Sequence, residues 1–245
     1  MLINERQNKI LEFLKKNKTA YVKALARALY VSEATVRRDL NEMQKSGLIE
    51  RSHGGAILPD NADEISMFVR MNKNAKEKEL AATNALKHLP DFKTVFVDSS
   101  STALALAERM DLNFKTVVTN SLLSAMQLSK KQNVNLILLG GNVQYNTNSA
   151  TGSWTARLVR EFSFDLMLSS CAAVNENGVF ERSLEQKEIK LAAFERSKTR
   201  ILIVDSSKFS DVASYRMTGV DSYAFIATDK KPPEALLTAG VKILF

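Results

Sequence analysis

Two adjacent arginines, Arg37 and Arg38, lie in a segment whose apolar residues recur at helical spacing. An arginine guanidinium can bind guanine O6 and N7 through two parallel hydrogen bonds, or it can clamp a phosphate. Ser32 and Thr35 come shortly before them, and their hydroxyls can reach phosphates or base edges. The N-terminal end of a recognition helix approaches the base edges most closely. These residue types at this spacing therefore predict contact with DNA.

A glycine pair follows and offers a second surface of the same kind. Gly54 and Gly55 predict a tight turn whose backbone can approach a phosphate closely, and Arg51 and His53 place donors beside it. We expect residues 48–51 and 56–58 to pair as strands around this turn, as in a β-wing. The residues predicted to contact DNA are Ser32, Thr35, Arg37, Arg38, Arg51, His53, Gly54 and Gly55.

Three helices must position these side chains. Apolar spacing predicts helices over residues 5–16 and 22–29, joined by a short extended connection. A third helix begins after Ser32 as N-cap, runs to about residue 46, and ends with Gly47 at the C′ position. A solvated helix beside an ordinary hairpin would explain the arginine pair alone. The whole ordered set of helices, arginines and glycine turn favours a winged helix-turn-helix.

A run of hydroxyl side chains follows the apolar segment 94–97. Asp98 is followed by Ser99, Ser100, Ser101 and Thr102, and a segment rich in alanine and leucine comes next. The free amides and the dipole at the start of a helix form a cradle for phosphate. One capping hydroxyl would explain a single residue of this run. Four consecutive hydroxyls favour binding of a phosphate or polyol.

Further polar residues follow other predicted strands. Asn120 can cap a helix, and Gly140–Gly141 is either a tight turn or a place where a ligand meets bare backbone. Asp205 offers a carboxylate for sugar hydroxyls and Lys208 offers a cation for phosphate, although the two could equally form a surface ion pair. Trp154 is expected to pack in the core or in an interface. The predicted effector-binding residues are Asp98, Ser99, Ser100, Ser101, Thr102, Asn120, Gly140, Gly141, Asp205 and Lys208.

The remainder of the chain alternates short apolar segments with amphipathic ones, which predicts an α/β domain on a mostly parallel sheet. In such sheets ligands bind at the carboxyl ends of the strands, where the polar residues above occur. One helix is expected from residues 67–79 onward, ended by Pro90. The expected strands cover residues 94–97, 116–118, 134–139, 164–168, 201–204, 223–226 and 241–245.

Length and charge agree with one large and one small domain and with a polyanionic partner, although a mild basic excess is also common in proteins that bind no nucleic acid. The net charge is +7, and residues 1–60 carry 11 lysines and arginines against 7 acidic residues, so the basic excess is concentrated there. Residues 59–64 are polar and typical of turns. We expect a DNA-binding domain over residues 1–58, a linker over 59–75, and an α/β domain over 76–245 that senses an effector and oligomerises.

Other classes of protein are disfavoured. Cys171 is the only cysteine, which excludes an internal disulfide, and the apolar runs are far shorter than a bilayer span. The start of the chain lacks the apolar core of a signal peptide, so we expect a cytoplasmic protein without a membrane partner. With His53 and His88 as its only histidines, the chain offers no histidine-based triad or metal cluster. We predict no cofactor and no enzymatic activity.

Two stretches, Val31–Leu40 and Gly47–Ala56, resemble the signature of DeoR-type transcriptional regulators. The resemblance implies a winged helix-turn-helix on double-stranded operator DNA, in a protein that usually represses operons for sugar or polyol use. It also implies a homo-oligomer, a dimer or a tetramer, since such proteins place paired DNA-binding units on repeated half-sites.

The resemblance extends more loosely over the α/β domain. The family motifs correspond here to Asp98–Thr102, Thr119–Asn120, Gly140–Gly141 and Asp205–Lys208, and Arg70 and Lys76 lie where the family tends to have basic residues. The implied fold is similar to that of ribose-phosphate isomerases and CoA transferases. The implied role is sensing of a phosphorylated sugar.

Two departures from the family pattern affect the predicted ligand site. Ser100 replaces a loop glycine, and residues 169–181 contain Gly178 as their only glycine. Serine adopts positive φ less readily than glycine, so the site could be altered. One alternative is therefore a ligand-independent DNA-binding regulator with a degenerate effector site. A less favoured one is a sugar-phosphate isomerase-like enzyme that uses Asp98, Asp205 and Lys208.

Overall fold

The computed structural model describes residues 3–45, 48–57, 67–209 and 213–245, which fall into two compact units, Met1–Phe68 and Val69–Phe245. We call them the N-terminal unit and the C-terminal unit and describe each by itself. The predicted linker, residues 59–75, lies partly outside the described residues. Its later part contains helix α4 (Met67–Asn72) and the first residue of α5 (Ala75–Leu86).

The N-terminal unit contains three helices and a small sheet. The helices are α1 (Ile3–Asn17), α2 (Val22–Leu29) and α3 (Glu33–Lys45), close to the predicted ranges. The roles predicted for Gly47 and Leu58 lie outside the described residues. Strands β2 (Glu50–Ser52) and β3 (Gly55–Ile57) form the expected hairpin. The extended connection is a third strand, β1 (Thr19–Tyr21), which pairs with β3 in the sheet order β1-β3-β2.

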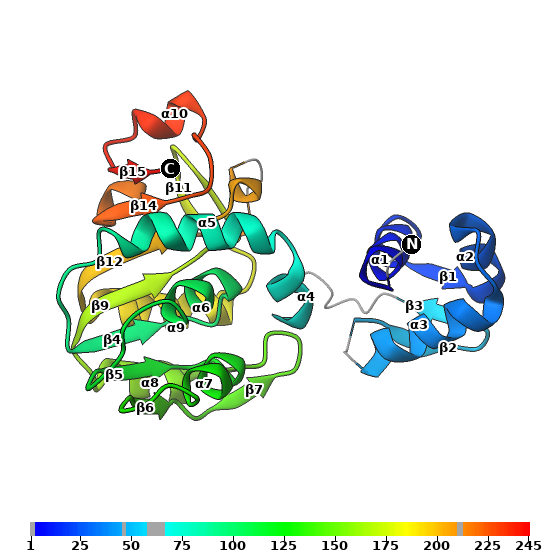
Figure 1. Ribbon diagram of the computed structural model, residues 1–245, viewed down its shortest axis with the longest axis horizontal. Coiled ribbons are helices and arrows are strands. Elements are labelled where there is room, and N and C mark those ends of the chain that lie inside the picture. Colours follow the sequence, from blue (N-terminus) through cyan, green and yellow to red (C-terminus); the bar gives the residue numbers. More distant parts are fainter. Residues whose placement is uncertain (1–2, 46–47, 58–66, 210–212) are drawn as a thin grey trace. The chain divides into compact units, whose positions relative to one another are not determined.

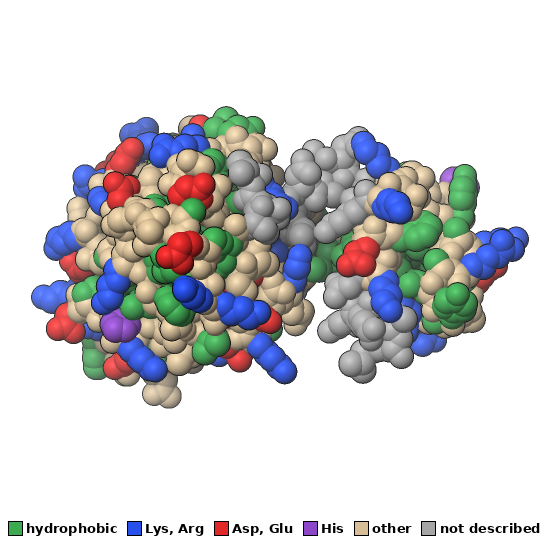
Figure 2. Space-filling view, turned by 90° about the horizontal axis from the view of Figure 1, so that it is seen from above, with side chains coloured by type: hydrophobic (Ala, Val, Ile, Leu, Met, Phe, Trp, Pro, Cys, Tyr) green, Lys and Arg blue, Asp and Glu red, His purple; other side chains and the backbone are tan. Residues whose placement is uncertain are grey.

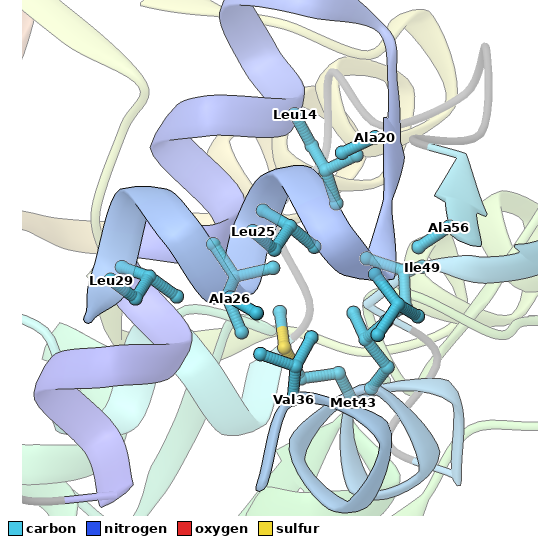
Figure 3. Close-up of a cluster of buried hydrophobic side chains, with 12 residues drawn as sticks. Leu14, Ala20, Leu25, Ala26, Leu29, Val36, Met43, Ile49 and Ala56 are labelled. Atoms are coloured by element: carbon cyan, nitrogen blue, oxygen red, sulfur yellow. The ribbon is translucent and has the colours of Figure 1, made fainter. Parts of the chain in front are cut away.

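Apolar residues from all three helices meet in one core. Leu14 of α1, Leu25 of α2 and Val36, Leu40 and Met43 of α3 are fully buried. Figure 3 shows Leu25, Val36 and Met43 facing one another between the helices, with Ile49 and Ala56 of the hairpin region nearby. The helical spacing on α3 thus buries one face and leaves Arg37 and Arg38 exposed on the other.

The C-terminal unit is built on a parallel seven-stranded sheet with the order β15-β14-β12-β9-β4-β5-β6. This confirms the predicted α/β fold. The order runs outward in both directions from the pair β4–β9, which makes that pair the topological switch point. The strands are β4 (Thr94–Val97), β5 (Thr116–Thr119), β6 (Asn135–Leu138), β9 (Phe164–Ser169), β12 (Ser197–Ile203), β14 (Phe225–Ala227) and β15 (Ile243–Leu244).

Helices cover both faces of this sheet (Figure 1). On one face α5 packs against α6 (Ser101–Ala107), and on the other α8 (Ser153–Arg160) packs against α9 (Leu184–Glu195). Strands β4 and β9 are therefore covered on both sides and are almost entirely apolar, as buried parallel strands usually are. Helix α7 (Leu122–Leu128) connects β5 to β6, and the short helix α10 (Glu234–Leu237) precedes β15.

Two small antiparallel sheets were not predicted. One is the hairpin β7 (Asn142–Gln144) and β8 (Ser149–Thr151). The other has the order β10-β11-β13, formed by β10 (Ala173–Asn175), β11 (Gly178–Glu181) and β13 (Tyr215–Thr218). Gly178 has φ +143° beside the carbonyl of Thr218, so the one glycine of residues 169–181 serves this pairing.

Two other expectations need correction. The helix expected from residues 67–79 onward is broken: α4 and α5 are separated at Lys73–Asn74, where Asn74 has φ +53°. Asparagine tolerates this left-handed conformation better than most residues, and the reversal separates the two helices. Trp154 is 62% exposed, so it does not belong to the core of this chain. Its expected packing in an interface stays a prediction.

Candidate DNA-binding surface and effector site

The start of α3 is fixed by the residues that were predicted to cap it. The Thr35 amide donates to the Ser32 Oγ at 3.1 Å, and the two hydroxyl oxygens lie 2.9 Å apart. Arg37 is exposed and forms an ion pair with Glu33 one turn earlier at 3.3 Å. Arg38 is exposed beside it. Exposed pairs of this kind contribute little to stability, so Arg37 can leave Glu33 for a phosphate.

A buried ion pair fixes α3 against α1. Both guanidinium nitrogens of Arg6 that face α3 donate to the Asp39 carboxylate, the second of them at 2.8 Å. Asp39 is almost completely buried, and its carboxylate would be costly to bury unpaired. Asp39 follows the two arginines directly, so this contact sets the rotation of α3 and hence the direction in which Arg37 and Arg38 point.

The wing residues divide into two groups. His53 and Gly54 are exposed at the tip, where Gly54 has φ +80°. Arg51 instead donates to the Asn41 side chain at 2.9 Å and lies 3.5 Å from the Arg37 carbonyl, so it ties the wing to α3. Gly55 is buried, and a Cβ there would collide with the Ala20 carbonyl of β1. In the protein without DNA, Arg51 thus fixes the wing to α3, and Gly55 allows it to pack closely against β1.

On the visible face of the N-terminal unit, basic side chains are scattered among hydrophobic and other polar ones and outnumber the acidic side chains (Figure 2). A polyanion would meet little repulsion on such a surface. Of the residues predicted to contact DNA, the structure leaves Ser32, Arg37, Arg38, His53 and Gly54 exposed and Thr35 partly exposed.

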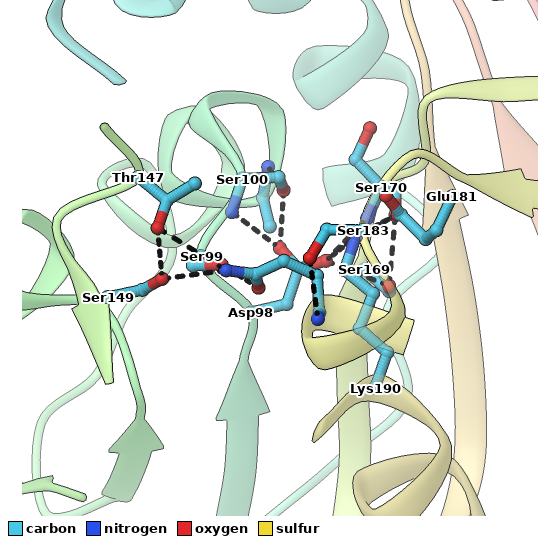
Figure 4. A network of polar contacts seen from close by, with 12 residues as sticks. Asp98, Ser99, Ser100, Thr147, Ser149, Ser169, Ser170, Glu181, Ser183 and Lys190 are labelled. Atoms are coloured by element: carbon cyan, nitrogen blue, oxygen red, sulfur yellow. Dashed lines mark hydrogen bonds and ion pairs between the residues drawn. The ribbon is translucent and has the colours of Figure 1, made fainter. Parts of the chain in front are cut away.

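In the C-terminal unit, Asp98 lies at the switch point. Its carboxylate accepts hydrogen bonds from the segment after β4 and from the end of β9. One carboxylate oxygen accepts the Ser100 amide at 2.9 Å and the Ser100 hydroxyl. The other accepts the Ser169 hydroxyl at 2.9 Å and the Ser170 amide at 3.0 Å, and Lys190 Nζ lies 3.1 Å away. Asp98 therefore joins the end of β4 to the end of β9 (Figure 4).

Lys190 of α9 is buried between two carboxylates. Its ammonium donates to Glu181 of β11 and to the Ser170 carbonyl at 2.7 Å, in addition to its contact with Asp98. Burial alone would lower the pKa of Lys190, but the two carboxylates raise it above its usual value. Burial alone would raise the pKa of Asp98, but Lys190 and the hydrogen bonds from Ser100 and Ser170 lower it. Lys190 and Asp98 are thus both charged at neutral pH.

Ser99 is engaged in a second arm of the same network. Its hydroxyl donates to the Gln186 side-chain carbonyl at 2.8 Å, and the Gln186 amide donates to Ser149 at 2.8 Å and to Thr147 at 3.4 Å. All four side chains are buried. Figure 4 shows this arm running from the end of β4 to the β7–β8 hairpin. Helix α9 thereby holds both sides of the site.

Ser100 fits its position without strain. Its φ of −93° is ordinary for serine, and its hydroxyl accepts the Ala103 amide at 3.1 Å as the N-cap of α6. The positive φ that a glycine could supply is not needed here, so the first departure from the family pattern leaves the loop intact. Ser101 donates to the Arg70 carbonyl at 3.3 Å, and Thr102 is buried beside it.

Asn120 does not cap α7, because Ser121 does so by accepting the Ser124 amide at 3.1 Å. The Asn120 amide nitrogen donates to the Ala150 carbonyl at 2.9 Å. Its carbonyl oxygen is buried and accepts no hydrogen bond from any residue that the structure describes. A buried acceptor of this kind costs free energy unless a ligand or water donates to it. Val97 and Thr119 are paired across β4 and β5, which places Asn120 beside Asp98.

The two glycines after β6 differ in what they require. Gly141 has φ +152°, and a Cβ there would collide with the Thr155 hydroxyl and lie 3.0 Å from the Thr151 carbonyl. A Cβ on Gly140 would meet no described atom within 4 Å. Gly141 is thus needed for packing against α8, whereas Gly140 faces open space.

Asp205 is held by its neighbours. It accepts the Ser207 amide at 3.2 Å, the Ser207 hydroxyl, and the Asn74 side-chain amide at 2.9 Å. Burial would raise the pKa of Asp205, but these hydrogen bonds and the nearby Lys208 and Lys78 lower it. Among the described residues, Asp205 and Lys208 form no ion pair within 4.0 Å. The alternative of a surface pair is therefore not supported, and Lys208 remains partly exposed.

Several residues of the site escaped sequence reasoning. Glu181, Gln186 and Lys190 are buried polar residues, and Gln186 and Lys190 are four apart on α9. A lysine on the face of α9 that also carries Ile189 and Ala193 was the available signal. Lys78 gave a similar signal on α5, where its face also carries Ala81, Ala82 and Ala85. Lys76, which the resemblance indicated, is exposed.

The two units together define a class of protein: a winged helix-turn-helix joined to an α/β unit with a polar site at its switch point. Comparison with known proteins agrees. Residues 6–62 match the DeoR-like helix-turn-helix domain, and residues 73–230 match the DeoR C-terminal sensor domain. The chain therefore belongs to the DeoR family of transcriptional regulators, as the resemblance implied.

Curated relatives match along nearly the full length. The HTH-type transcriptional regulator GolR of Listeria innocua is 32% identical over 95% of this chain and 92% of its own. The glycerol-3-phosphate regulon repressor of Escherichia coli is 30% identical over 95% and 93%. A ribose 5-phosphate isomerase structure from Methanocaldococcus jannaschii matches 56% of this chain and 55% of its own, with 16% identity and a TM-score of 0.40.

No helix in the described part of the chain is long and apolar enough to cross a membrane.

Proposed function

We propose that this protein is an effector-controlled repressor of an operon for sugar or polyol use, released by a phosphorylated metabolite. One observation carries the proposal: a polar network fills the switch point of the unit that matches the sensor domain, and the same chain carries a winged helix. The relatives named above, one of them a glycerol-3-phosphate regulon repressor, support the assignment. The effector would act through a difference in affinity for two states of the protein.

For operator DNA, we propose that Arg37 and Arg38 contact base edges in the major groove. Ser32 and Thr35 would donate hydrogen bonds to phosphates. His53 and Gly54 would follow the backbone from the wing. Arg51 and Gly55 would act by holding the wing against α3 and β1. Half-sites of operators are usually repeated, so we also propose a homo-oligomer, a dimer or a tetramer. A DNA partner also implies action in the cytoplasm.

For the effector, the proposed contacts are the groups that the protein leaves available. These are the Asn120 carbonyl oxygen, the open space beside the Cα of Gly140, and the side chains of Thr102 and Lys208. Asp98, Ser99, Ser100, Ser101, Gly141 and Asp205 would shape the site from behind, because their side chains or Cβ positions are already engaged.

Operator binding tests the first part of the proposal. An operator is selected from random duplexes, and its affinity is measured over a range of salt concentrations. We expect Arg38→Ala to lose about 1–3 kcal/mol of binding free energy and to relax specificity at one base pair. Lys16→Ala, an exposed single-charge change on α1, is the matched control. Equal losses in both variants would contradict base recognition by α3.

A metabolite screen tests the second part. Phosphorylated sugars and polyol phosphates are added to the operator complex, with their unphosphorylated forms as controls. We expect selective release by one phosphorylated compound, and loss of that release in Lys208→Ala.

The engagement of Asp98, Ser99 and Ser100 within the protein favours one other candidate, a ligand-independent regulator. Operator release by no metabolite would support it. We propose no enzymatic role, since the named relatives are regulators. Turnover of a pentose phosphate that vanished in Lys208→Ala would refute that part.

A further inference from the structure

The junction between α4 and α5 is fastened to the ends of the sheet strands at several points. The Lys78 ammonium donates to the carbonyl of Arg70 and, at 2.6 Å, to that of Lys73. Ser101, the first residue of α6, donates to the same Arg70 carbonyl. Asn74 donates to Asp205, in the loop after β12. We call these contacts of Lys78, Ser101 and Asn74 the α4 clamp.

Lys78 is buried among other basic residues. It is only 6% exposed, and among the described residues that influence it most, Asp205 attracts its charge whereas Lys208, Arg70 and Lys73 oppose it. Burial first, and then these three cations, lower the pKa of Lys78 to about 8 despite the attraction of Asp205. A buried ammonium among like charges is stabilised by an anion, so this position is suited to a phosphate.

The clamp holds the segment through which the C-terminal unit continues into the N-terminal unit. Helix α4 ends at the clamped carbonyls, and in the chain it follows residues 58–66, which come directly after strand β3 of the wing. A ligand that alters the clamp contacts at the end of α4 therefore acts on the segment that joins the C-terminal unit to the N-terminal unit.

We propose that an anionic effector binds at Lys78 and Lys208 and draws the Lys78 ammonium away from the Arg70 carbonyl. The ammonium would exchange two neutral carbonyl acceptors for a charged phosphate oxygen, which forms stronger hydrogen bonds. The end of α4 would then lose the Lys78 contacts, keep those of Ser101 and Asn74, and become looser. This inference rests on the proposed function, because it assigns the route by which an effector reaches the DNA-binding unit.

Hydrogen exchange on the full-length protein tests the inference without DNA. Inorganic phosphate and glycerol 3-phosphate serve as probes, glycerol is the uncharged control, and sodium chloride matches the ionic strength. We expect both anions to raise the melting temperature and to speed exchange of the α4 amides, including the Lys73 amide that donates to the Val69 carbonyl.

Variants locate the response. In Lys78→Gln the side-chain amide can still donate to the carbonyls but carries no charge, so we expect roughly tenfold weaker anion binding and no change of α4 exchange. Lys76→Gln removes the exposed lysine two residues earlier on α5 and should behave as wild type. In Ser101→Ala the α4 amides should exchange faster even without anion.

Three results would overturn the inference: an unchanged melting temperature with both anions, equal anion binding in Lys78→Gln, or slower α4 exchange when phosphate is added to wild type. The last needs no variant and stands even if Lys78→Gln fails to fold. Because none of these measurements involves DNA, they fail separately from the proposed function, which fails if the wild type binds no operator.

Discussion

Replacing Lys190 with methionine should remove the one cation from a buried set of three charges. Lys190 lies between Asp98 and Glu181, and all three side chains are less than 10% exposed. Asp98 keeps its hydrogen bonds from Ser100, Ser169 and Ser170 in the variant. Glu181 has no other side-chain hydrogen bond among the described residues, so the larger part of the penalty should come from this group.

Breaking a buried ion pair by removing one partner costs about 3–5 kcal/mol. That loss is a large fraction of the roughly 5–15 kcal/mol that stabilises a typical domain. The sign of the pH dependence follows from the same contacts. Wild-type Asp98 has a lowered pKa, so its stabilisation is present at neutral pH and declines in acid. In Lys190→Met the buried Asp98 carboxylate would take up a proton more readily, so the deficit should shrink as the pH falls.

Urea unfolding followed by tryptophan fluorescence measures this deficit. Trp154 is the only tryptophan, and it lies in the C-terminal unit, so the signal reports on the unit that contains Lys190. Lys187→Met on the same helix is partly exposed and should change stability by less than about 0.5 kcal/mol. Adding Glu181→Gln to Lys190→Met should recover part of the loss. A deficit below about 1 kcal/mol, or one equally large at pH 7 and pH 5, would refute the charge argument.

Three further predictions concern other parts of the molecule. Gly55→Ala places a Cβ against the Ala20 carbonyl and should destabilise the N-terminal unit by about 1–3 kcal/mol in thermal unfolding, whereas Gly140→Ala, in open space, should be nearly neutral. Arg6→Met should cost about 3–5 kcal/mol by leaving the Asp39 carboxylate buried and unpaired, and the double variant with Asp39→Asn should recover much of it; no recovery would argue against an ionic contact. Hydrogen bonds from Lys198, Lys93 and Thr94 lower the pKa of Asp165 to about 2, so its contribution is present above about pH 4 and is lost as the pH falls toward 2. Asp165→Asn should therefore cost about 1 kcal/mol at pH 7, after allowance for solvent screening, and nothing at pH 2 in acid titrations of stability.

The recognition helix and the parallel sheet could be predicted because their signals are local. Val36, Leu40 and Met43 repeat at helical spacing, and each strand of the large sheet contains a short apolar run. Strand β1 and the two small sheets have strands of only three or four residues, too short to show a period, and their partners lie elsewhere in the chain. The break at Asn74 depends on Asp205, which lies 131 residues later.

The sequence predicts where the polar residues lie at the edge of the sheet, but it does not predict which side chains contact one another there. The strand-end rule locates Asp98 and its hydroxyl neighbours correctly, because all parallel strands present their carboxyl ends at one edge. The rule does not say that α9 supplies Lys190 and Gln186 to the same place. The contact between Ser99 and Gln186 joins residues 87 positions apart, and it depends on how α9 rotates against the sheet.

The self-contained core of the N-terminal unit has a consequence for the order of synthesis. Every buried residue of that core lies between Ile10 and Ala56, so the unit can assemble as soon as the first 57 residues are free to fold. The remaining 188 residues take roughly 10–40 s to translate at about 5–20 residues per second. Until residue 190 has been translated, a nascent chain carries a DNA-binding unit whose sensor lacks Lys190. A fragment that ends soon after the wing would never acquire the sensor. It would bind DNA half-sites, and no metabolite could release it.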